Sequence, residues 1–202
     1  MSNISELLLN NKYYIKVLNT AKQVGTELNI PVYLVGGAVR DLLLGNNKGK
    51  DIDLMVEKDS STFTKELAKK LKVKTIISYE KFHTYKIPYS DIEIEIAAAR
   101  KETYKSDSRK PDTVVLTTVK EDLERRDFTV NAIAVSIMNK NFGELYDPLN
   151  GIGDLNKGIL KTPKDPDTTF SDDPLRMLRA IRFSTTLNFE IETGIKTSIT
   201  KQ

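Results

Sequence analysis

Residues Leu34 to Asp53 read LVGGAVRDLLLGNNKGKDID, and this stretch predicts a strand, a glycine turn, a helix and a second strand. The apolar run at its start leads into Gly36 and Gly37, where the absence of side chains lets a ligand approach the backbone. The first amides of the following helix attract an anion, and Arg40 lies one turn further on. We therefore expect a phosphate-binding turn, although a glycine pair after a strand is also an ordinary turn signal.

Two carboxylates close this stretch. Asp51 and Asp53 alternate with Ile52 and Leu54, so on a strand both acids face the same way. Two carboxylates on one face repel each other unless a cation lies between them, and hard cations such as Mg²⁺ prefer oxygen ligands. A Walker loop is excluded, because Asp51 stands where that motif needs Ser or Thr. The glycine turn and the acid pair together predict a phosphate site with a metal.

A third carboxylate is a candidate in the segment DIEIEIAAAR, residues Asp91 to Arg100. Acidic and apolar residues alternate here, so a strand would direct Glu93 and Glu95 away from the core. Such a strand can bring an acid beside Asp51 and Asp53, which is the arrangement that two-metal phosphoryl chemistry requires. Periodicity alone favours an edge strand with a solvated acidic face.

Composition limits the classes of function. The 202 residues are 39% hydrophobic, enough for one domain or one domain and part of another. The chain has no cysteine and one histidine, His83, so thiol nucleophiles and cysteine-based zinc sites are excluded and catalysis must depend mainly on Asp, Glu, Arg and Lys. The net charge of +3 is compatible with a nucleotide or RNA partner. Since no apolar run can span a bilayer and the amino terminus lacks a secretion signal, we expect a cytoplasmic protein without membrane contact.

The flanking segments have simpler predictions. Apolar spacing indicates one or two helices over Ile4 to Asn29 and another behind Asp59. Two strands are expected over Val73 to Ser78 and Phe82 to Pro88. The polar segment Lys101 to Lys120 predicts a mobile loop that covers or flanks a site.

Arginines mark two later segments. Arg125 and Arg126 in EDLERRDFTVNAIAVSI suit paired phosphate oxygens, although a helix surface would also explain them. The segment TFSDDPLRMLRAIRF predicts a helix with proline at its first position behind an Asp cap. Its basic stripe is formed by Arg176, Arg179 and Arg182. Its buried side is expected to consist of Leu175, Leu178, Ala180, Ile181 and Phe183.

Turn formers in YDPLNGIGDLNKG, residues Tyr146 to Gly158, predict a domain boundary. The segment before it contains the expected strands, and the segment after it is expected to be wholly helical. We place the two domains at residues 1–147 and 148–202.

These motifs together resemble a known family. GGAVRD with DID, RRDFTVNAIA, DPLNGIGDL and DDPLRMLRAIRF have the order and spacing of the bacterial class II tRNA nucleotidyltransferase and poly(A) polymerase family, from Val32 to Phe189. The resemblance implies an α+β fold, with a DNA polymerase β-like nucleotidyltransferase head of one small mixed sheet flanked by helices and an all-helical neck. On this basis residues 1–147 are the catalytic head and 148–202 an incomplete neck, with the body and tail absent.

The resemblance also implies a reaction and a set of site residues. Members of the family add CMP and AMP from CTP and ATP to the 3′ end of tRNA, using Mg²⁺ in a two-metal in-line transfer that releases pyrophosphate. Asp51 and Asp53 correspond to the metal ligands, with Glu95 as a third catalytic carboxylate. The implied nucleotide-binding residues are Gly36, Gly37, Arg40, Arg125, Arg126, Asp173, Arg176, Arg179 and Arg182. One departure is Asp172, where the family usually has Glu.

Asp173 and Arg176 match the pair that reads the incoming base in this family. Positions three apart on a helix are neighbours, so Asp173 can accept from the amino group of cytosine or adenine while Arg176 donates to the adjacent ring nitrogen. Uracil and guanine present the opposite pattern. The alternative is that Asp173 is simply a helix cap.

Several products stay open at this point. Poly(A) polymerases of the family carry a basic GRRF-like stretch, whereas this chain reads YEKFHTYKI over Tyr79 to Ile87, which favours tRNA as the substrate. Members that add only CC or only A share the same motifs. A non-catalytic nucleotide- or RNA-binding module of the same fold is a further alternative, and the intact acids argue against it.

Overall fold

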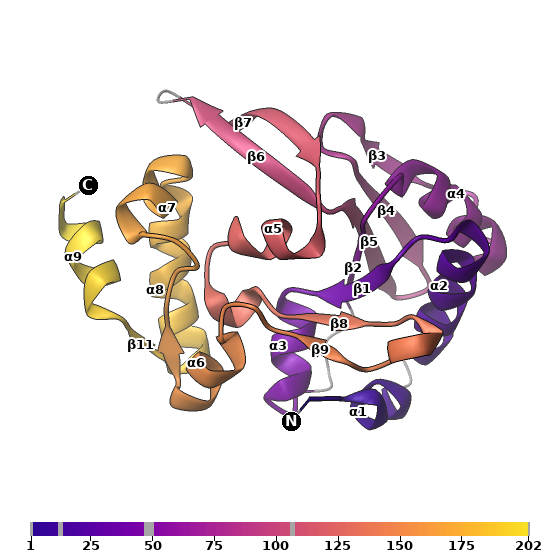
Figure 1. The fold of residues 1–202 in the computed structure, drawn as a ribbon, viewed down its shortest axis with the longest axis horizontal. Helices are drawn as coiled ribbons and strands as arrows, with labels where there is room; N and C mark the ends of the chain where they lie inside the picture. Colours follow the sequence, from indigo (N-terminus) through magenta and orange to yellow (C-terminus); the bar gives the residue numbers. More distant parts are fainter. Residues whose placement is uncertain (1, 12–13, 47–50, 106–107, 202) are drawn as a thin grey trace.

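One seven-stranded mixed sheet forms the centre of the molecule, and a helical unit lies beside it (Figure 1). The computed structural model describes residues 2–11, 14–46, 51–105 and 108–201. In spatial order the strands are β3 (Ile77–Tyr79), β4 (Thr84–Tyr89), β5 (Ile92–Ala98), β2 (Ile52–Val56), β1 (Val32–Val35), β8 (Ala134–Ser136) and β9 (Leu145–Tyr146). β2 and β5 are parallel, and the other neighbours are antiparallel. The predicted α+β class is therefore confirmed.

Alternation along β2 separates the core from the site. Ile52 and Leu54 are buried in the main core, which includes residues of α2 (Ile15–Leu28) and α4 (Ser60–Leu71). Met55 belongs to a smaller cluster on the opposite face of the sheet. The Asp53 backbone pairs in register with that of Glu95 on the neighbouring strand β5. The predicted division of acids and apolar residues between two faces is confirmed.

The predicted helices of the first half begin and end at recognisable residues. α1 (Ser5–Asn10) and α2 occupy the first predicted helical region. α4 begins behind Asp59, whose carboxylate accepts from the N–H groups of Ser61 and Thr62 at 2.9 and 3.1 Å. These bonds satisfy amides that the first turn of a helix leaves without a partner.

The segment predicted as a mobile loop is a β-hairpin. β6 (Arg100–Lys105) and β7 (Ser108–Leu116) pair antiparallel and lead into α5 (Val119–Glu124). Figure 1 shows the hairpin extending from the sheet toward the helical unit. The loop prediction was wrong because the polar composition hid a run of β-branched Thr and Val residues that suits paired strands. The basic turn within the opening stretch, residues 47–50, lies outside the described residues.

The carboxyl-terminal unit contains helices and one small sheet. Its helices are α6 (Gly151–Lys157), α7 (Pro166–Asp172), α8 (Leu175–Leu187) and α9 (Thr193–Lys201). β10 (Ile159–Leu160) and β11 (Glu190–Ile191) pair in parallel between them. The prediction of a wholly helical end is therefore corrected by one two-residue strand pair.

A second hydrophobic core holds this unit together. Its buried members include Phe128 and Phe183, whose rings meet edge to face with centroids 5.9 Å apart. Since Phe128 lies in the loop after α5, this core joins the helical unit to the sheet domain. On α8 the buried side was only partly predicted: Ala180 and Phe183 are buried. Its remaining predicted members are 42%, 64% and 51% exposed: Leu175, Leu178 and Ile181.

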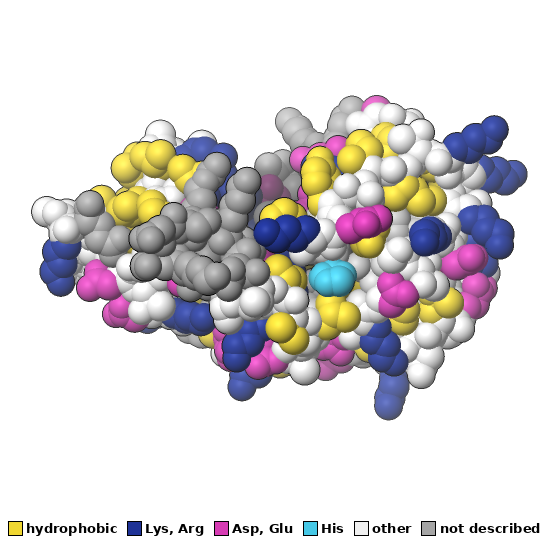
Figure 2. All heavy atoms as spheres, turned by 90° about the horizontal axis from the view of Figure 1, so that it is seen from above, with side chains coloured by type: hydrophobic (Ala, Val, Ile, Leu, Met, Phe, Trp, Pro, Cys, Tyr) yellow, Lys and Arg dark blue, Asp and Glu magenta, His cyan; other side chains and the backbone are white. Residues whose placement is uncertain are grey.

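The outer surface is mixed in character. Figure 2 shows acidic and basic side chains interspersed with small apolar areas, and the single histidine, His83, lies on this face. Within the described residues, no helix is both long enough and apolar enough to cross a bilayer.

Candidate active site

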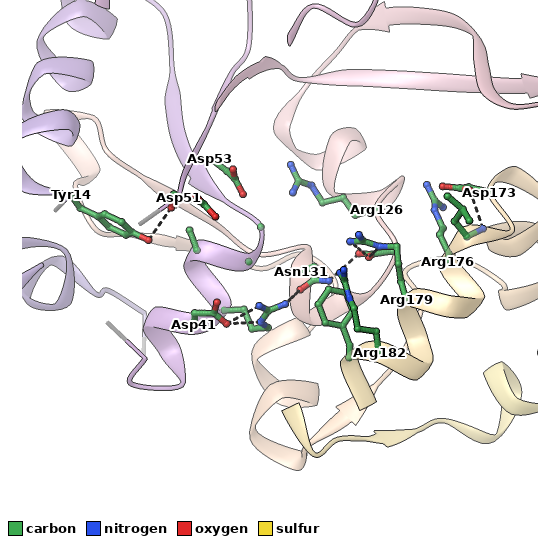
Figure 3. A pocket seen from close by; sticks show the side chains of 17 residues that line it. Tyr14, Asp41, Asp51, Asp53, Arg126, Asn131, Asp173, Arg176, Arg179 and Arg182 are labelled. Carbon is green, nitrogen blue, oxygen red and sulfur yellow. Dashed lines mark hydrogen bonds and ion pairs between the residues drawn. The ribbon is translucent and has the colours of Figure 1, made fainter. Parts of the chain in front are cut away.

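A cavity of about 630 Å³ is lined by residues of both the sheet domain and the helical unit (Figure 3). Figure 3 shows the labelled carboxylates Asp51 and Asp53 on one side of this cavity and the arginines of α8 on the other. Ten of the predicted site residues line it: Gly36, Gly37, Arg40, Asp51, Asp53, Arg126, Asp173, Arg176, Arg179 and Arg182. His83 is not among the lining residues.

The acid side of the cavity holds an electrostatically strained carboxylate. Burial raises the pKa of Asp53 to about 6, and the charges of Glu95 and Asp51 add to this rise, whereas Arg126 opposes it. A cation beside Asp51 and Asp53 would offset this repulsion. The oxygen donors therefore suit a hard divalent cation such as Mg²⁺.

Glu95 is the register partner of Asp53 on the neighbouring strand but is not among the residues that line the larger cavity. It lines a smaller hollow of about 100 Å³ together with Asp53 and Arg126. Its carboxylate forms an ion pair with Lys86 on β4 at 3.4 Å. Among the described residues, no three acidic or histidine side chains gather in a group that could hold one metal ion. The role of Glu95 as a third catalytic carboxylate stays a prediction.

The glycine turn has a steric reason. Gly36 has a φ of +73°, which glycine adopts without strain, and α3 (Gly37–Leu43) begins directly after it. A Cβ on Gly36 would lie 3.2 Å from Nη1 of Arg126 and 3.4 Å from Oδ2 of Asp53. The absent side chain therefore leaves room where the glycine turn meets the acid and the arginine.

Three guanidinium groups surround one ring at the other side of the cavity. Arg40, Arg179 and Arg182 lie 5.1, 5.2 and 4.8 Å from the centroid of Phe183. Arg40 also pairs with Asp41 at 2.8 Å and donates from Nη1 to Asn131 at 2.7 Å. The cluster places three cationic groups against one aromatic ring. Two of them also form ion pairs, Arg40 with Asp41 and Arg179 with Asp127.

Asp127 fixes one of these arginines. Its Oδ2 forms an ion pair with Arg179 at 2.6 Å, and its Oδ1 accepts from Asn131 at 3.1 Å. Asp127 and Asn131 line the cavity but were not predicted as site residues. Both lie within the motif RRDFTVNAIA, so an isolated polar Asn inside an apolar run was the available signal.

Tyr14 is a further cavity-lining residue that was not predicted. Its hydroxyl donates to the backbone carbonyl of Asp51 at 3.2 Å, and burial together with the nearby Asp53 raises its pKa to about 12. Tyr14 directly precedes α2 and belongs to no recognisable motif. Nothing in the local sequence distinguished it from a core aromatic residue.

The predicted base-reading pair shares the cavity. One carboxylate oxygen of Asp173 accepts from the N–H of Leu175 at 3.1 Å, as a helix cap does. Arg176 is buried and donates from Nη2 to the carbonyl of Arg125 at 2.9 Å. Arg125 itself is not among the cavity-lining residues, and its guanidinium binds Asp122 and Glu102 instead. The geometry brings Asp173 and Arg176 to the cavity but not the Arg125 side chain.

A sequence profile described as "Poly A polymerase head domain" matches residues 32–161, which include the glycine turn and the acid pair. The chain belongs to the poly(A) polymerase head domain family. The resemblance stated from the motifs is thereby confirmed.

Curated relatives of this poly(A) polymerase head domain chain are tRNA nucleotidyltransferases. The A-adding tRNA nucleotidyltransferase of Geobacter sulfurreducens is 38% identical over 178 residues, which cover 88% of this chain and 20% of that protein. The CCA-adding enzyme of Lactobacillus helveticus is 37% identical over 177 residues, covering 87% of this chain and 41% of the relative. The chain therefore spans less than half the length of these relatives.

Solved structures of CCA-adding enzymes share the fold. One apo structure is 38% identical with a TM-score of 0.85, covering 98% of this chain and 46% of that chain. A complex with ATP is 35% identical with a TM-score of 0.83, covering 98% and 45%. The Thermotoga maritima CCA-adding enzyme complexed with tRNA is 33% identical with a TM-score of 0.83, covering 98% and 44%. The head fold predicted from the motifs is confirmed.

Proposed function

We propose that this chain is the catalytic head and part of the neck of an enzyme that adds CMP and AMP to the 3′ end of tRNA. The observation that carries the proposal is one cavity with a carboxylate pair at one side and Asp173 with Arg176 at the other. For both metal-assisted transfer and recognition of the base, one bound nucleotide must reach the carboxylate pair with its triphosphate and Asp173 and Arg176 with its base. Relatives named as CCA-adding and A-adding enzymes, and their complexes with ATP and tRNA, support the same function.

Each side of the cavity has a proposed task. Asp173 accepts from the amino group of cytosine or adenine, and Arg176 donates to the neighbouring ring nitrogen. Arg126 and the cluster of Arg40, Arg179 and Arg182 attract the triphosphate. These residues hold the α-phosphorus in line with the RNA 3′-hydroxyl, since catalysis of phosphoryl transfer is mostly positioning and charge stabilisation.

We propose Mg²⁺ as the metal and Asp51 and Asp53 as its ligands. When bound there, it favours loss of the hydroxyl proton and neutralises charge on the departing pyrophosphate. In the reaction the 3′-oxygen forms a bond to the α-phosphorus, the α–β phosphoanhydride bond breaks, and the hydroxyl proton is released. The raised pKa of Asp53 supports this assignment, because a carboxylate pair of this kind is costly without a cation.

Two assignments complete the proposal. Residues 1–147 form the head and 148–202 the beginning of the neck. An enzyme that adds only A is the second candidate, because the Geobacter sulfurreducens relative carries that name.

The test is nucleotide addition by the purified chain. We would incubate it with Mg²⁺ and with labelled CTP and ATP, each alone and both together. The RNA substrate is a tRNA that ends either before CCA or after CC, and the product length is read on a gel. CCA synthesis predicts two C and one A on the first substrate and one A on the second. Addition of A to the second substrate alone would identify the A-only enzyme.

Asp53→Ala is expected to abolish addition while the protein stays folded. The control is Glu66→Ala, which removes a surface carboxylate of α4 that pairs with Lys69. Full activity of a folded Asp53→Ala variant would refute the site. Mg²⁺-dependent CTP and ATP binding without any addition would indicate that the nucleotide site needs further RNA-holding segments.

A further inference from the structure

Asp122 is a buried carboxylate that the proposed reaction does not use. It lies on α5, and its side chain is 1% exposed. Oδ1 accepts from Nε and Nη2 of Arg125 at 3.0 and 2.6 Å and from the N–H of Arg100 at 3.1 Å. Oδ2 accepts from Nε and Nη2 of Arg126 at 3.2 and 3.0 Å. Each oxygen therefore holds one guanidinium group by two of its nitrogens.

The Arg126 arm of this arrangement leads to the acid side of the cavity. Because Nε and Nη2 bind Asp122, the remaining nitrogen Nη1 extends toward Gly36, 3.2 Å from the position that a Cβ would take there. Arg126 lies close enough to lower the pKa of Asp53. Its hydrogen bonds nevertheless go to Asp122, which keeps the guanidinium from closing onto the pocket carboxylates.

The Arg125 arm leads to the base-reading side. Asp122 and Glu102 hold the Arg125 side chain, with Glu102 Oε2 3.3 Å from Nη1. The carbonyl of Arg125 then accepts from Nη2 of Arg176 at 2.9 Å. In the view of Figure 3, Arg126 lies between Asp53 and Arg176. Arg126 thus binds Asp122 directly, and Arg176 is connected to Asp122 through Arg125.

We propose that Asp122 is a positioning residue that sets the orientation of Arg126 toward the triphosphate and of Arg176 toward the base. The inference rests on the proposed function, since it gives those two arginines their ligands. Asp122, which does not line the large cavity, thereby contributes to nucleotide affinity and to selection of the base. A guanidinium held by two bonds to a buried acid keeps one geometry, whereas a loose one samples many.

The test begins in nucleotide-free protein. Asp122→Asn keeps the size of the side chain but removes its charge and one acceptor oxygen. The matched control is Asp154→Asn on α6, a buried carboxylate that accepts from Thr129 at 2.7 Å and does not line the cavity. In NMR spectra, the Nε–H signals of Arg125 and Arg126 should exchange slowly with water in the unchanged chain and in the control. In Asp122→Asn the Arg126 signal should exchange fast, whereas the Arg125 signal should change less, because Arg125 Nε also donates to the carbonyl of Arg100 at 2.8 Å.

The second readout is equilibrium binding of CTP and UTP with Mg²⁺. For Asp122→Asn we expect CTP affinity to fall by about tenfold or more, as for loss of other residues that orient a site. The preference for CTP over UTP should fall as well. A change confined to overall stability would not alter this ratio in the folded protein.

Glu102→Gln keeps the proposal testable if Asp122→Asn does not fold. Glu102 pairs with Arg100 and Arg125, so of the two arginines bound to Asp122 this variant is expected to loosen Arg125. The preference for CTP over UTP should therefore fall while affinity for inorganic tripolyphosphate stays unchanged. Unchanged CTP affinity and selectivity in a folded Asp122→Asn variant, or an equal loss in Asp154→Asn, would overturn the proposal. So would unchanged selectivity in Glu102→Gln. Failure of the unchanged chain to bind CTP would instead refute the proposed function, and the arginine signals would still report whether Asp122 holds the two side chains.

Discussion

The carboxylate of Asp53 is largely buried beside other acids, and its ionisation therefore lowers the stability of the metal-free fold. Asp53 belongs to a strand of the sheet, yet burial and the neighbouring acids raise its pKa to about 6. Between about pH 4 and pH 6 the folded state therefore binds more protons than the unfolded state, and the metal-free protein loses stability as the pH rises through this window.

Replacing this charge should stabilise the protein in the absence of metal. At pH 7 in EDTA, Asp53→Asn should increase the free energy of unfolding by about 1–3 kcal/mol, because two pKa units correspond to about 2.7 kcal/mol. Mg²⁺ should stabilise the unchanged chain and leave the variant nearly unaffected. Urea unfolding with EDTA and with Mg²⁺ measures both effects. A variant less stable than the unchanged chain in EDTA would contradict this account.

At the residue scale, the sequence predicted the side chains whose chemistry is local. Asp51 and Asp53 were predicted because strand alternation fixes their face, and the structure places both at the cavity. Tyr14 was missed because its contact with Asp51 joins segments 37 residues apart in the chain. Arg125 and Arg126 are adjacent, chemically identical and both bound to Asp122. No local signal therefore separated Arg126, which lines the cavity, from Arg125, which Glu102 also binds.

At the scale of elements, α6 depends on one close backbone approach. A Cβ on Gly151 would lie 2.2 Å from the carbonyl oxygen of Thr129, in the short 3₁₀ turn Thr129–Asn131. The carboxylate of Asp147 accepts from the N–H groups of Gly151 and Ile152 at 2.7 and 2.9 Å. These contacts fix the first turn of the helix against the loop that carries Asp127 and Asn131.

Gly151→Ala should therefore push α6 away from the turn at Thr129. The free energy of unfolding should fall by about 1–3 kcal/mol or more. Gly153→Ala on the same helix is the control. The three atoms nearest to its Cβ would belong to the side chain of Asn150, which can move, whereas those nearest to the Cβ of Gly151 include backbone atoms of Thr129. Alanine also favours a helix over glycine by about 1 kcal/mol. Thermal unfolding of both variants tests the difference. Equal effects would show that the approach of α6 to Thr129 is not tight.

Element prediction failed where packing partners decided the outcome. The β6–β7 hairpin has a polar composition, and only its antiparallel pairing distinguishes it from a loop. On α8, apolar residues surround the helix, and the sequence alone did not show which of them meet Phe128 and α7. Phe183 lies inward, whereas Leu178 is 64% exposed.

Across the whole molecule, the cavity spans two hydrophobic cores. Asp53 lies on β2 and Asp51 directly before it, and residues Ile52 and Leu54 of this strand pack in the main core. Asp173 and Arg176 belong to the unit built on the second core. A nucleotide that contacts both sides stabilises their docked arrangement by mass action, by about 2.7 kcal/mol at a concentration of one hundred times Kd.

Hydrogen exchange can measure this coupling. With Mg²⁺ and CTP, the amides of α8 should become more protected, because local opening of the second core now also requires release of the ligand. Amides in the centre of β1 and β2 should change less, since the sheet already holds them. UTP is the control nucleotide and should protect α8 less than CTP does. Equal protection by both nucleotides would argue against base reading by the helical unit.

The division of the cavity between two cores has a consequence for errors on heating. Under the proposed function, the chemistry belongs to the unit with the larger core and the selection of the base to the unit with the smaller core. The Phe128–Phe183 contact links the smaller core to the loop of the sheet domain. The smaller core should loosen first as temperature rises. Such an enzyme would begin to incorporate wrong nucleotides before it stopped adding nucleotides. Its upper working temperature would therefore be set by fidelity and not by rate.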